Sequence, residues 1–295
     1  MDNITRILTK DNLKRNGYNL IANLSNIEFH EICQFAINET KQRPELKSPE
    51  KDSVNFDTIN LVLRNIERKL DMQVPVAQIV GSIKIGNLEL QITPDVLIPR
   101  VETEGLIELG KSLIFGKMQS NNCKPLTILE VGIGSGYISL EIGKTFEAYK
   151  VVHLIAIEKS RQAARVARSN LRSNNIKNVD IVETSIEEFS TDTKFDLIIS
   201  NPPYIPTRSK HVSRKVKLNE PTMALFAGQE GLDLAREILQ FGKTHLNENS
   251  HILLELNSKS QILKLEKEYK HYFKFQSFKD TFGKWRYTQV EQLID

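Results

Sequence analysis

The sequence predicts an α/β protein with a mostly parallel β-sheet, preceded by a smaller helical region. From residue 127 onwards, short apolar segments typical of buried strands alternate with helical segments. The first of these strands runs directly into a glycine-rich turn, and a later one runs into two consecutive prolines. Residues 1–75 show helical patterns instead. These observations favour one α/β domain with an additional N-terminal part.

Composition limits the class of protein. The chain has 295 residues and is 40% hydrophobic, which is enough for one full catalytic domain and a smaller domain. Its formal net charge of +3 is too small to imply a nucleic-acid partner. No apolar run approaches the length of a membrane span. Cys33 and Cys123 are expected to be unpaired thiols in a reducing compartment.

The N-terminal region is expected to be helical at 29–37 and 59–70, with a loop at 41–52 that contains two prolines. Its first twenty residues mix acidic and basic side chains, so they do not form a secretory signal and make a poor transit peptide. Residues 78–85 and 88–92 alternate apolar and polar residues around Gly86-Asn87. This pattern predicts a β-hairpin, after which residues 94–104 lead into a helix that extends through residue 113.

The remaining segments follow in strand–helix order. Strands are expected at 127–131, 151–157, 179–182, 195–200 and 251–256, and helices at 137–146, 160–174, 232–246 and 259–269. The C-terminal tail differs, because its two strands, 272–276 and 285–291, have only a turn with Gly283 between them. The last strand is therefore expected to run antiparallel.

The glycine-rich turn follows the first strand of this series. Gly132, Gly134 and Gly136 alternate with Ile133 and Ser135, in the sequence GIGSG. Alternating glycines let a backbone bend sharply and approach a ligand, and the following helix presents free N–H groups. The spacing differs from the GxGxxG of nucleotide-phosphate sites and suits a cofactor without phosphates. A glycine-rich turn without any ligand is the alternative.

Two acidic residues accompany the turn. Glu130 precedes it and can attract an ammonium or sulfonium group, whereas it would repel a pyrophosphate. Glu158 ends the next strand, where a carboxylate can accept hydrogen bonds from both hydroxyls of a ribose. A surface carboxylate is the alternative for Glu158. Together with the turn, these residues describe a site for an adenosine that carries a charged amino-acid tail.

The tetrapeptide Asn201-Pro202-Pro203-Tyr204 follows the strand at 195–200. Its prolines fix the backbone in a rigid corner at the carboxyl end of a central strand, where open α/β sheets bind ligands. The Asn201 side-chain oxygen and the Pro202 carbonyl can accept hydrogen bonds from an amide nitrogen and hold it for methyl transfer. Tyr204 can stack on a flat substrate group. A proline-rich turn that merely ends the strand is the alternative.

Other charged residues are weaker candidates. Arg100, Glu102 and Glu104 form either part of the active-site wall or a solvated helix start. Glu220 either shapes the substrate pocket or lies in a surface loop. The basic run 208–217 follows the tetrapeptide and is either a solvated loop or a docking surface for a partner. The six histidines show no metal-ligand spacing, so no metal site is expected.

From about residue 75 to the C-terminus, the chain resembles the HemK-type protein-(glutamine) N-methyltransferases, which modify the GGQ glutamine of class I peptide-chain release factors. The segments that carry the resemblance are PVAQIVGSIKIGNLELQITPDVLIPRVETE, LEVGIGSGYISLEIG, ISNPPYIP and NEPTMALFAGQEGLDLAREIL. NPPY alone is shared with DNA adenine methyltransferases. Its combination with the flanking segments is specific.

The resemblance implies a seven-stranded Rossmann-like S-adenosylmethionine-dependent methyltransferase fold with an N-terminal helical domain. It implies a helical substrate-docking domain at 1–75, a β-hairpin linker at 76–104 and a catalytic domain at 105–295. The GIGSG turn, Glu158 and Asn201 would contact S-adenosylmethionine, with Ser185 and Ile186 beside the adenine. Residues 201–204 would grip the substrate glutamine.

The chain also departs from the family pattern. Val101 replaces the usual Pro, and Glu130 and Glu158 stand where Asp is common. Ser185 replaces the Asp that usually bonds the adenine amino group, although its hydroxyl or Glu187 can substitute. These departures and the unusual N-terminal region favour a divergent, organellar member of the family.

The resulting expectation is a soluble, intracellular, monomeric methyltransferase whose partner is a class I release factor and which binds neither membrane nor nucleic acid directly. It would lie in the mitochondrial matrix if the source is eukaryotic and in the cytoplasm if bacterial. Two alternatives stay open. An adenine-N6 methyltransferase on DNA or RNA would need a base-flipping pocket and a basic face. A non-enzymatic cofactor-binding assembly partner would not need the NPPY tetrapeptide.

Overall fold

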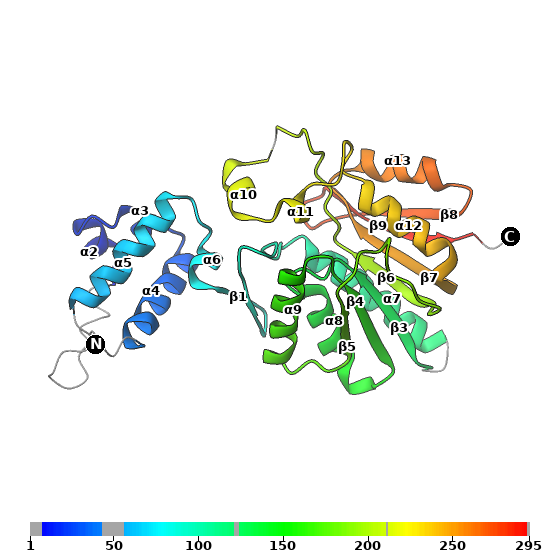
Figure 1. The fold of residues 1–295 in the computed structure, drawn as a ribbon, viewed down its shortest axis with the longest axis horizontal. Helices are drawn as coiled ribbons and strands as arrows, with labels where there is room; N and C mark the ends of the chain where they lie inside the picture. The colour runs from blue at the N-terminus through cyan, green and yellow to red at the C-terminus, as the bar shows by residue number, and fades with distance from the viewer. Residues whose placement is uncertain (1–7, 43–55, 121–123, 211, 294–295) are drawn as a thin grey trace. The chain divides into compact units, whose positions relative to one another are not determined.

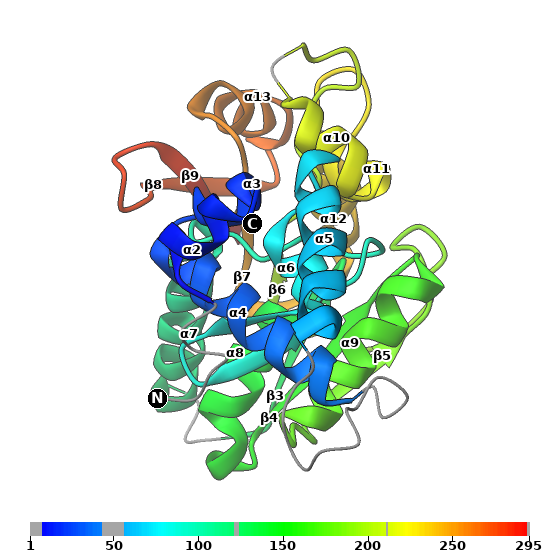
Figure 2. The ribbon, with the colours of Figure 1, turned by 90° about the vertical axis from the view of Figure 1, so that its left-hand side faces the viewer.

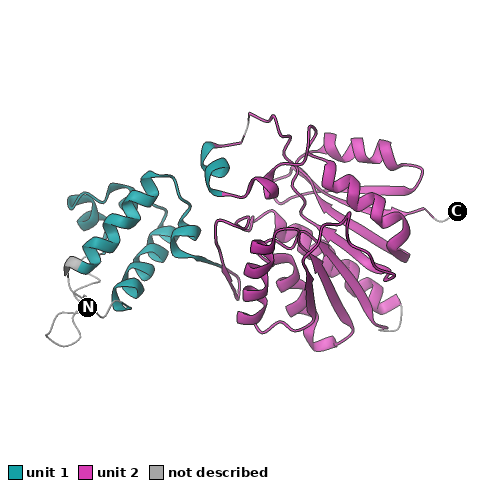
Figure 3. Ribbon diagram, in the orientation of Figure 1, with its two compact units in different colours: residues 1–83, 214–219 teal, residues 84–213, 220–295 magenta. Residues whose placement is uncertain are grey.

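The computed structural model describes residues 8–42, 56–120, 124–210 and 212–293. The chain divides into two compact units, coloured separately in Figure 3. Unit 1 comprises residues 1–83 and 214–219, and unit 2 comprises residues 84–213 and 220–295. None of the helices in the described part of the chain combines the length and the apolar character that a membrane span needs. Cys123 and most of the loop expected at 41–52 lie outside the described residues.

Unit 1 is helical and has its own apolar core. Its helices are α2 (Lys10–Arg15), α3 (Asn19–Ala22), α4 (Asn26–Lys41), α5 (Phe56–Asp71), α6 (Val76–Val80) and α10 (Arg214–Asn219). α4 and α5 pack against each other (Figure 2). A capping box starts α4, because the Ser25 hydroxyl accepts from the Glu28 N–H while the Glu28 carboxylate accepts from the Ser25 N–H. Cys33 is buried in this core, and burial raises the pKa of its thiol to about 11.

The predicted β-hairpin is shorter than the alternating pattern indicated. Its strands are β1 (Ser82–Ile85) and β2 (Leu88–Gln91), and the expected strand residues 78–80 belong to helix α6 instead. Pro75 lies at the N-cap of α6, and Gly81, with a φ of 83°, ends it. The buried residues Val76 and Ile79 are three positions apart, so they lie on one face of a helical turn. For residues 78–80, the pattern of apolar and polar residues alone did not distinguish a strand from a short helix.

The sheet of unit 2 has seven strands in the order β5-β4-β3-β6-β7-β9-β8 (Figure 1). The strands are β3 (Leu126–Val131), β4 (Val152–Ile157), β5 (Val179–Val182), β6 (Phe195–Ser200), β7 (Leu246–Glu255), β8 (Phe273–Lys279) and β9 (Trp285–Gln292). The first five are parallel, and β9 is antiparallel to both β7 and β8. This confirms the parallel sheet and the antiparallel last strand. β7 starts earlier than expected, because Leu246 already pairs with Phe195 ahead of a register shift.

Helices cover both faces of the sheet. They are α7 (Thr103–Ser120), α8 (Tyr137–Phe146), the short η2 (Glu147–Tyr149), α9 (Arg161–Ser173), α11 (Thr222–Leu225), α12 (Asp233–His245) and α13 (Lys259–Tyr269). A Cβ on Gly110 of α7 would meet Ile199, and one on Gly242 of α12 would come close to Ile198. Because neighbouring residues of a strand point to opposite faces, α7 and α12 lie on opposite sides of β6. α7 extends to Ser120, beyond the expected end at residue 113.

The strand order places the site. From β3 the chain continues through α8 to β4 on one side and returns through β5 to β6 on the other side. The strand order therefore reverses between β3 and β6. In open α/β sheets, ligands bind at the carboxyl ends of the strands beside such a reversal.

Candidate active site

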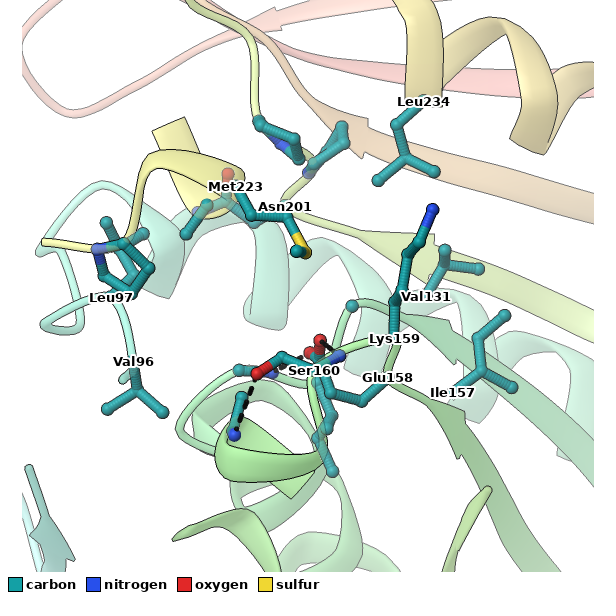
Figure 4. A pocket seen from close by; sticks show the side chains of 18 of the residues that line it. Val96, Leu97, Val131, Ile157, Glu158, Lys159, Ser160, Asn201, Met223 and Leu234 are labelled. Atoms are coloured by element: carbon teal, nitrogen blue, oxygen red, sulfur yellow. Dashed lines mark hydrogen bonds between the residues drawn. The ribbon is translucent and has the colours of Figure 1, made fainter. Parts of the chain in front are cut away.

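A cavity of about 570 Å³ lies in unit 2, where β3, β4 and β6 end. Figure 4 shows Glu158 and Ser160 on one side of it and Asn201 and Met223 across from them. Other wall residues come from the segment before α7 and its first residue, from the segment after β5 and from α12, among them Val96, Leu97, Arg100, Thr103, Ser185, Ile186 and Leu234. The cavity is therefore built from segments far apart in the sequence.

The glycine turn that follows β3 forms part of the cavity wall. Gly132, Gly134 and Gly136 have φ angles of 77°, 55° and 89°, which other residues rarely adopt. An added Cβ on Gly132 would meet nothing within 4 Å, so the backbone conformation and not the space requires glycine there. Gly132, Ile133, Gly134 and Ser135 line the cavity. Gly136 does not line it and forms the N-cap of α8.

Glu158, just beyond β4, holds the turn in place. Its Oε2 accepts a hydrogen bond from the Gly134 N–H at 3.0 Å, and its Oε1 accepts one from the Ser160 N–H at 2.8 Å. Each carboxylate oxygen has a second lone pair for a further donor. Because Glu158 also lines the cavity, it can bind the turn and a ligand hydroxyl together.

Glu130 is buried and has an exposed fraction of 1%. Its Oε2 accepts a hydrogen bond from the Ser139 hydroxyl, and its Oε1 has no partner among the described residues. Burial raises the pKa of Glu130 to about 8, and the charge of Glu158 adds to the rise. Since Glu130 belongs to the cavity wall, a cationic ligand group would satisfy the free oxygen and lower this pKa.

Ser185 and Ile186 follow β5 and line the cavity. Both are nearly buried, and Ile186 is part of the core that also contains Leu129 and Val131. The Ser185 hydroxyl accepts a hydrogen bond from the Glu188 N–H at 3.3 Å. Its own hydrogen is therefore available for another acceptor.

Asn201 follows the end of β6 and faces the cavity together with Pro202 and Pro203. The Asn201 Nδ2 group donates to Thr103 Oγ1 at 3.0 Å. The Thr103 hydroxyl in turn donates to Glu255 Oε2, also at 3.0 Å. Because the NH₂ group of the Asn201 amide is bonded to Thr103, its carbonyl oxygen Oδ1 remains to accept hydrogen bonds from a ligand.

Tyr204 lies behind this wall. It is not among the residues that line the cavity, and its ring packs against the core of the sheet. Its backbone carbonyl accepts from Gln261 Nε2 at 2.9 Å. Burial raises the pKa of its hydroxyl to about 12. Stacking of Tyr204 on a substrate therefore stays a prediction, which would require its ring to turn toward the cavity.

The comparisons with known proteins all find methyltransferases, and curated relatives with one shared name narrow the family. The model of the methyltransferase small domain matches residues 99–220. A release factor glutamine methyltransferase from Aliivibrio fischeri is 32% identical over 72% of this chain and 69% of its own length. A protein of the same name from Streptococcus pneumoniae is 31% identical over 79% of this chain and 80% of its own length.

The chain belongs to the release factor glutamine methyltransferase family. It is a methyltransferase, and the resemblance found in its sequence is confirmed. Its fold is also that of known methyltransferases. The catalytic domain of hMettl16, solved in complex with the MAT2A 3'UTR hairpin 6, superposes with a TM-score of 0.53 at 15% identity, over 89% of this chain and 92% of that one. The two relatives are bacterial, so they lend no support to a mitochondrial location, which stays a prediction.

The weaker candidates separate in the structure of this family member. Arg100 lines the cavity and forms an ion pair with the buried Glu220, at 2.6 Å from Nη2 to Oε1. Glu102 and Glu104 do not line it. Thr103, between them, does line it, and an uncharged residue in this charged segment carries no local signal that could have identified it.

Glu255 was also missed. It is a fully buried acid at the end of the apolar strand segment HILLE. A charged residue at the end of such a run was the signal that could have identified it. The basic run 208–217 divides between the units, with residues 214–219 forming α10 in unit 1 and residue 211 outside the described residues.

Proposed function

We propose that this methyltransferase transfers a methyl group from S-adenosylmethionine to the side-chain nitrogen of the glutamine in the GGQ motif of a class I release factor. One observation carries the proposal. Glu130 and Asn201 line the same cavity, and each has an oxygen without a partner from the wall: the buried Oε1 of Glu130 and the Oδ1 of Asn201, whose NH₂ group is bonded to Thr103. The first suits the charged end of a methyl donor, and the second suits an amide N–H of a methyl acceptor. The names of the bacterial relatives support the same substrate.

The residues on the donor side fit S-adenosylmethionine. Glu130 would accept hydrogen bonds from its ammonium group, which would satisfy the free Oε1. Glu158 would accept from the ribose hydroxyls with the lone pairs that the backbone leaves free. Ile186 would pack on the adenine, and the Ser185 hydroxyl would donate to it. When bound, the cofactor supplies an electrophilic methyl group.

The residues on the acceptor side address the weak nucleophilicity of an amide. Asn201 Oδ1 and the Pro202 carbonyl would each accept one N–H of the substrate amide, which orients the nitrogen and disperses the positive charge that develops on it. The two prolines keep this corner rigid. No strong base is needed, because an N-methylated amide cation loses its proton readily to water.

The proposed function also includes the surface that binds the release factor and the oligomeric state. Unit 1 and the basic run 208–217 would dock the release factor, and the basic run would suit acidic side chains of that partner. The protein would act as a monomer without direct contact to nucleic acid. A gel-filtration mass with and without the release factor tests the oligomeric state.

The central experiment offers labelled S-adenosylmethionine and, separately, a class I release factor, its GGQ-to-GGA variant and duplex DNA. Label that enters only the intact release factor supports the proposal. Label in duplex DNA supports adenine-N6 methylation and overturns it. Cofactor binding without label in any acceptor supports the non-enzymatic alternative.

A further inference from the structure

Glu255 is a buried acid that the proposed reaction does not use. Its exposed fraction is 0%, and its Oε1 has no partner among the described residues. It does not line the cavity. A buried carboxylate with an unsatisfied oxygen is costly, so its presence calls for a role.

The sheet explains how Glu255 reaches the active site. β6 and β7 are parallel neighbours, and Ser200 is paired with Leu254. Asn201 follows Ser200 and Glu255 follows Leu254, so the two residues are neighbours at the ends of the two strands. Thr103, the first residue of α7, lies between their side chains and bonds to both.

The number of hydrogens on each group fixes the direction of the two hydrogen bonds that connect Glu255, Thr103 and Asn201. An ionised carboxylate can only accept, so the Thr103 hydroxyl gives its single hydrogen to Glu255. Towards Asn201, the Thr103 oxygen can then only accept. Asn201 must therefore turn its NH₂ group to Thr103, and its carbonyl oxygen must face the opposite way.

We propose that Thr103 and Glu255 are positioning residues, which hold the Asn201 side chain in the orientation that presents Oδ1 to the substrate amide. This inference rests on the function proposed above. Without the chain of bonds, the Asn201 amide is free to rotate by half a turn and to present NH₂ to the substrate. Two donors would then face each other, and the substrate nitrogen would lose its acceptor.

The protonation state of Glu255 determines the direction of these hydrogen bonds. Burial raises the pKa of Glu255 to about 7, while the Thr103 hydroxyl and the charge of Arg286 oppose the rise. Glu102 raises this pKa further, and the Tyr204 hydroxyl lowers it.

The charged and titratable neighbours come from three segments: Glu102 before α7, Tyr204 after β6, and Arg286 and Tyr287 of β9. Arg286 is itself paired with the buried Asp280 at 3.4 Å. A protonated Glu255 can donate to Thr103, whose own hydrogen is then free to bond Asn201 Oδ1. The orientation is therefore fixed above the pKa of Glu255 and is released below it.

The test compares three variants in methyl transfer from labelled S-adenosylmethionine to an intact release factor. Thr103→Val keeps the shape and removes the hydroxyl, and we expect kcat to fall about tenfold, the factor that one hydrogen bond represents. Its Kd for the cofactor, measured by calorimetry, should stay within about twofold of the wild type. Thr103→Ser restores the hydroxyl and should recover most of the lost rate. Glu255→Gln can donate to Thr103 as the protonated carboxyl does, so its kcat at pH 8 should equal the reduced kcat that the wild type shows below about pH 7, and it should not fall further at lower pH.

A second measurement does not depend on the acceptor. The side-chain amide ¹⁵N–¹H signals of Asn201, assigned by their absence in Asn201→Ala, should be separate and protected from exchange in the wild type at pH 8. They should broaden or merge in Thr103→Val and as the wild type is titrated to pH 6.

The two measurements separate the two proposals. Signals that are identical in Thr103→Val and the wild type overturn the positioning role, as does an equal loss of kcat in Thr103→Val and Thr103→Ser. A wild-type protein that methylates no release factor overturns the proposed function instead, and the amide signals then decide the positioning role alone.

Discussion

Two buried glutamates, Glu130 and Glu255, lie at the carboxyl ends of strands of one sheet, yet their surroundings assign them different tasks. Each accepts a hydrogen bond from a hydroxyl group through one oxygen, and the other oxygen has no partner among the described residues. Burial raises the pKa of both carboxyl groups, to about 8 and about 7. Only Glu130 lines the cavity. The same residue type can therefore serve a ligand directly or act through a neighbour, and the position of the free oxygen decides which.

Asn201 is where the acceptor side reaches the cavity, so its loss should have the largest effect. Asn201→Ala removes the oxygen that is expected to hold the substrate nitrogen, and kcat should fall about 100-fold or more. Cofactor binding should weaken by less than about tenfold, because Glu130 and Glu158 stay in place. Single-turnover transfer of label and calorimetry measure the two quantities.

Asn174→Ala is a matched control, because Asn174 is the C-cap of α9 and does not line the cavity. Its kcat should match the wild type. Unchanged turnover in Asn201→Ala would remove the distinction between a donor side and an acceptor side.

Gly105 permits the close packing beside Glu255. A Cβ at this position would clash with the Tyr287 hydroxyl group, which donates to the Glu102 carbonyl. Gly105→Ala should therefore lower the free energy of unfolding by about 2 kcal/mol, since overpacking outweighs the better helix propensity of Ala. Urea unfolding measures this change.

Gly116 in the same helix provides the control, since a Cβ there would meet nothing within 4 Å. Gly116→Ala should be neutral or stabilising by up to about 1 kcal/mol. Equal stability of the two variants would show that Tyr287 can move away without cost, and the surroundings of Glu255 would then be less rigid than its role requires.

Glu130 tests the donor side through its protonation. The carboxyl is expected to hold its proton up to a pH of about 8 when no cation faces it, and binding an ammonium group requires the carboxylate. Affinity for S-adenosylmethionine should therefore rise from pH 6 to pH 8. Glu130→Gln should weaken binding about tenfold at pH 8 and make it independent of pH in this range. Calorimetry in two buffers of different ionisation enthalpy also reports the released proton.

The free protein should show the opposite trend in stability. The pKa of Glu130 is raised in the folded state from 4.5 to about 8, so the folded state binds more protons across this range and the contribution of Glu130 to stability decreases as pH rises through it. Glu141→Gln, a change outside the cavity, is the control for both measurements. An affinity of the wild type that is flat with pH would contradict a direct role of Glu130.

Sequence reasoning located the donor side more fully than the acceptor side. Glu130, the glycine turn and Glu158 follow strands and carry their signal within a few residues, so their common position could be predicted. Thr103 and Glu255 are 152 positions apart and meet only because α7 and β7 pack beside β6. No local pattern contains that contact. The ring of Tyr204 packs against the core, because burial of an aromatic ring depends on packing that the tetrapeptide alone does not specify, and its stacking on a substrate stays a prediction.

Substitutions of Ser185 should have the smallest effect, and they test how the cavity binds the adenine of the cofactor. It lines the cavity beside Glu187. Ser185→Asp should strengthen cofactor binding only about threefold, because the gain of a charged acceptor for the adenine amino group is offset by repulsion from Glu158 and Glu187. Ser185→Asn has the same shape without the charge and should bind like the wild type. Weaker binding by Ser185→Asp in calorimetry would mean that the acidic residues already present serve the adenine, and that the serine avoids an excess of negative charge on this side of the cavity.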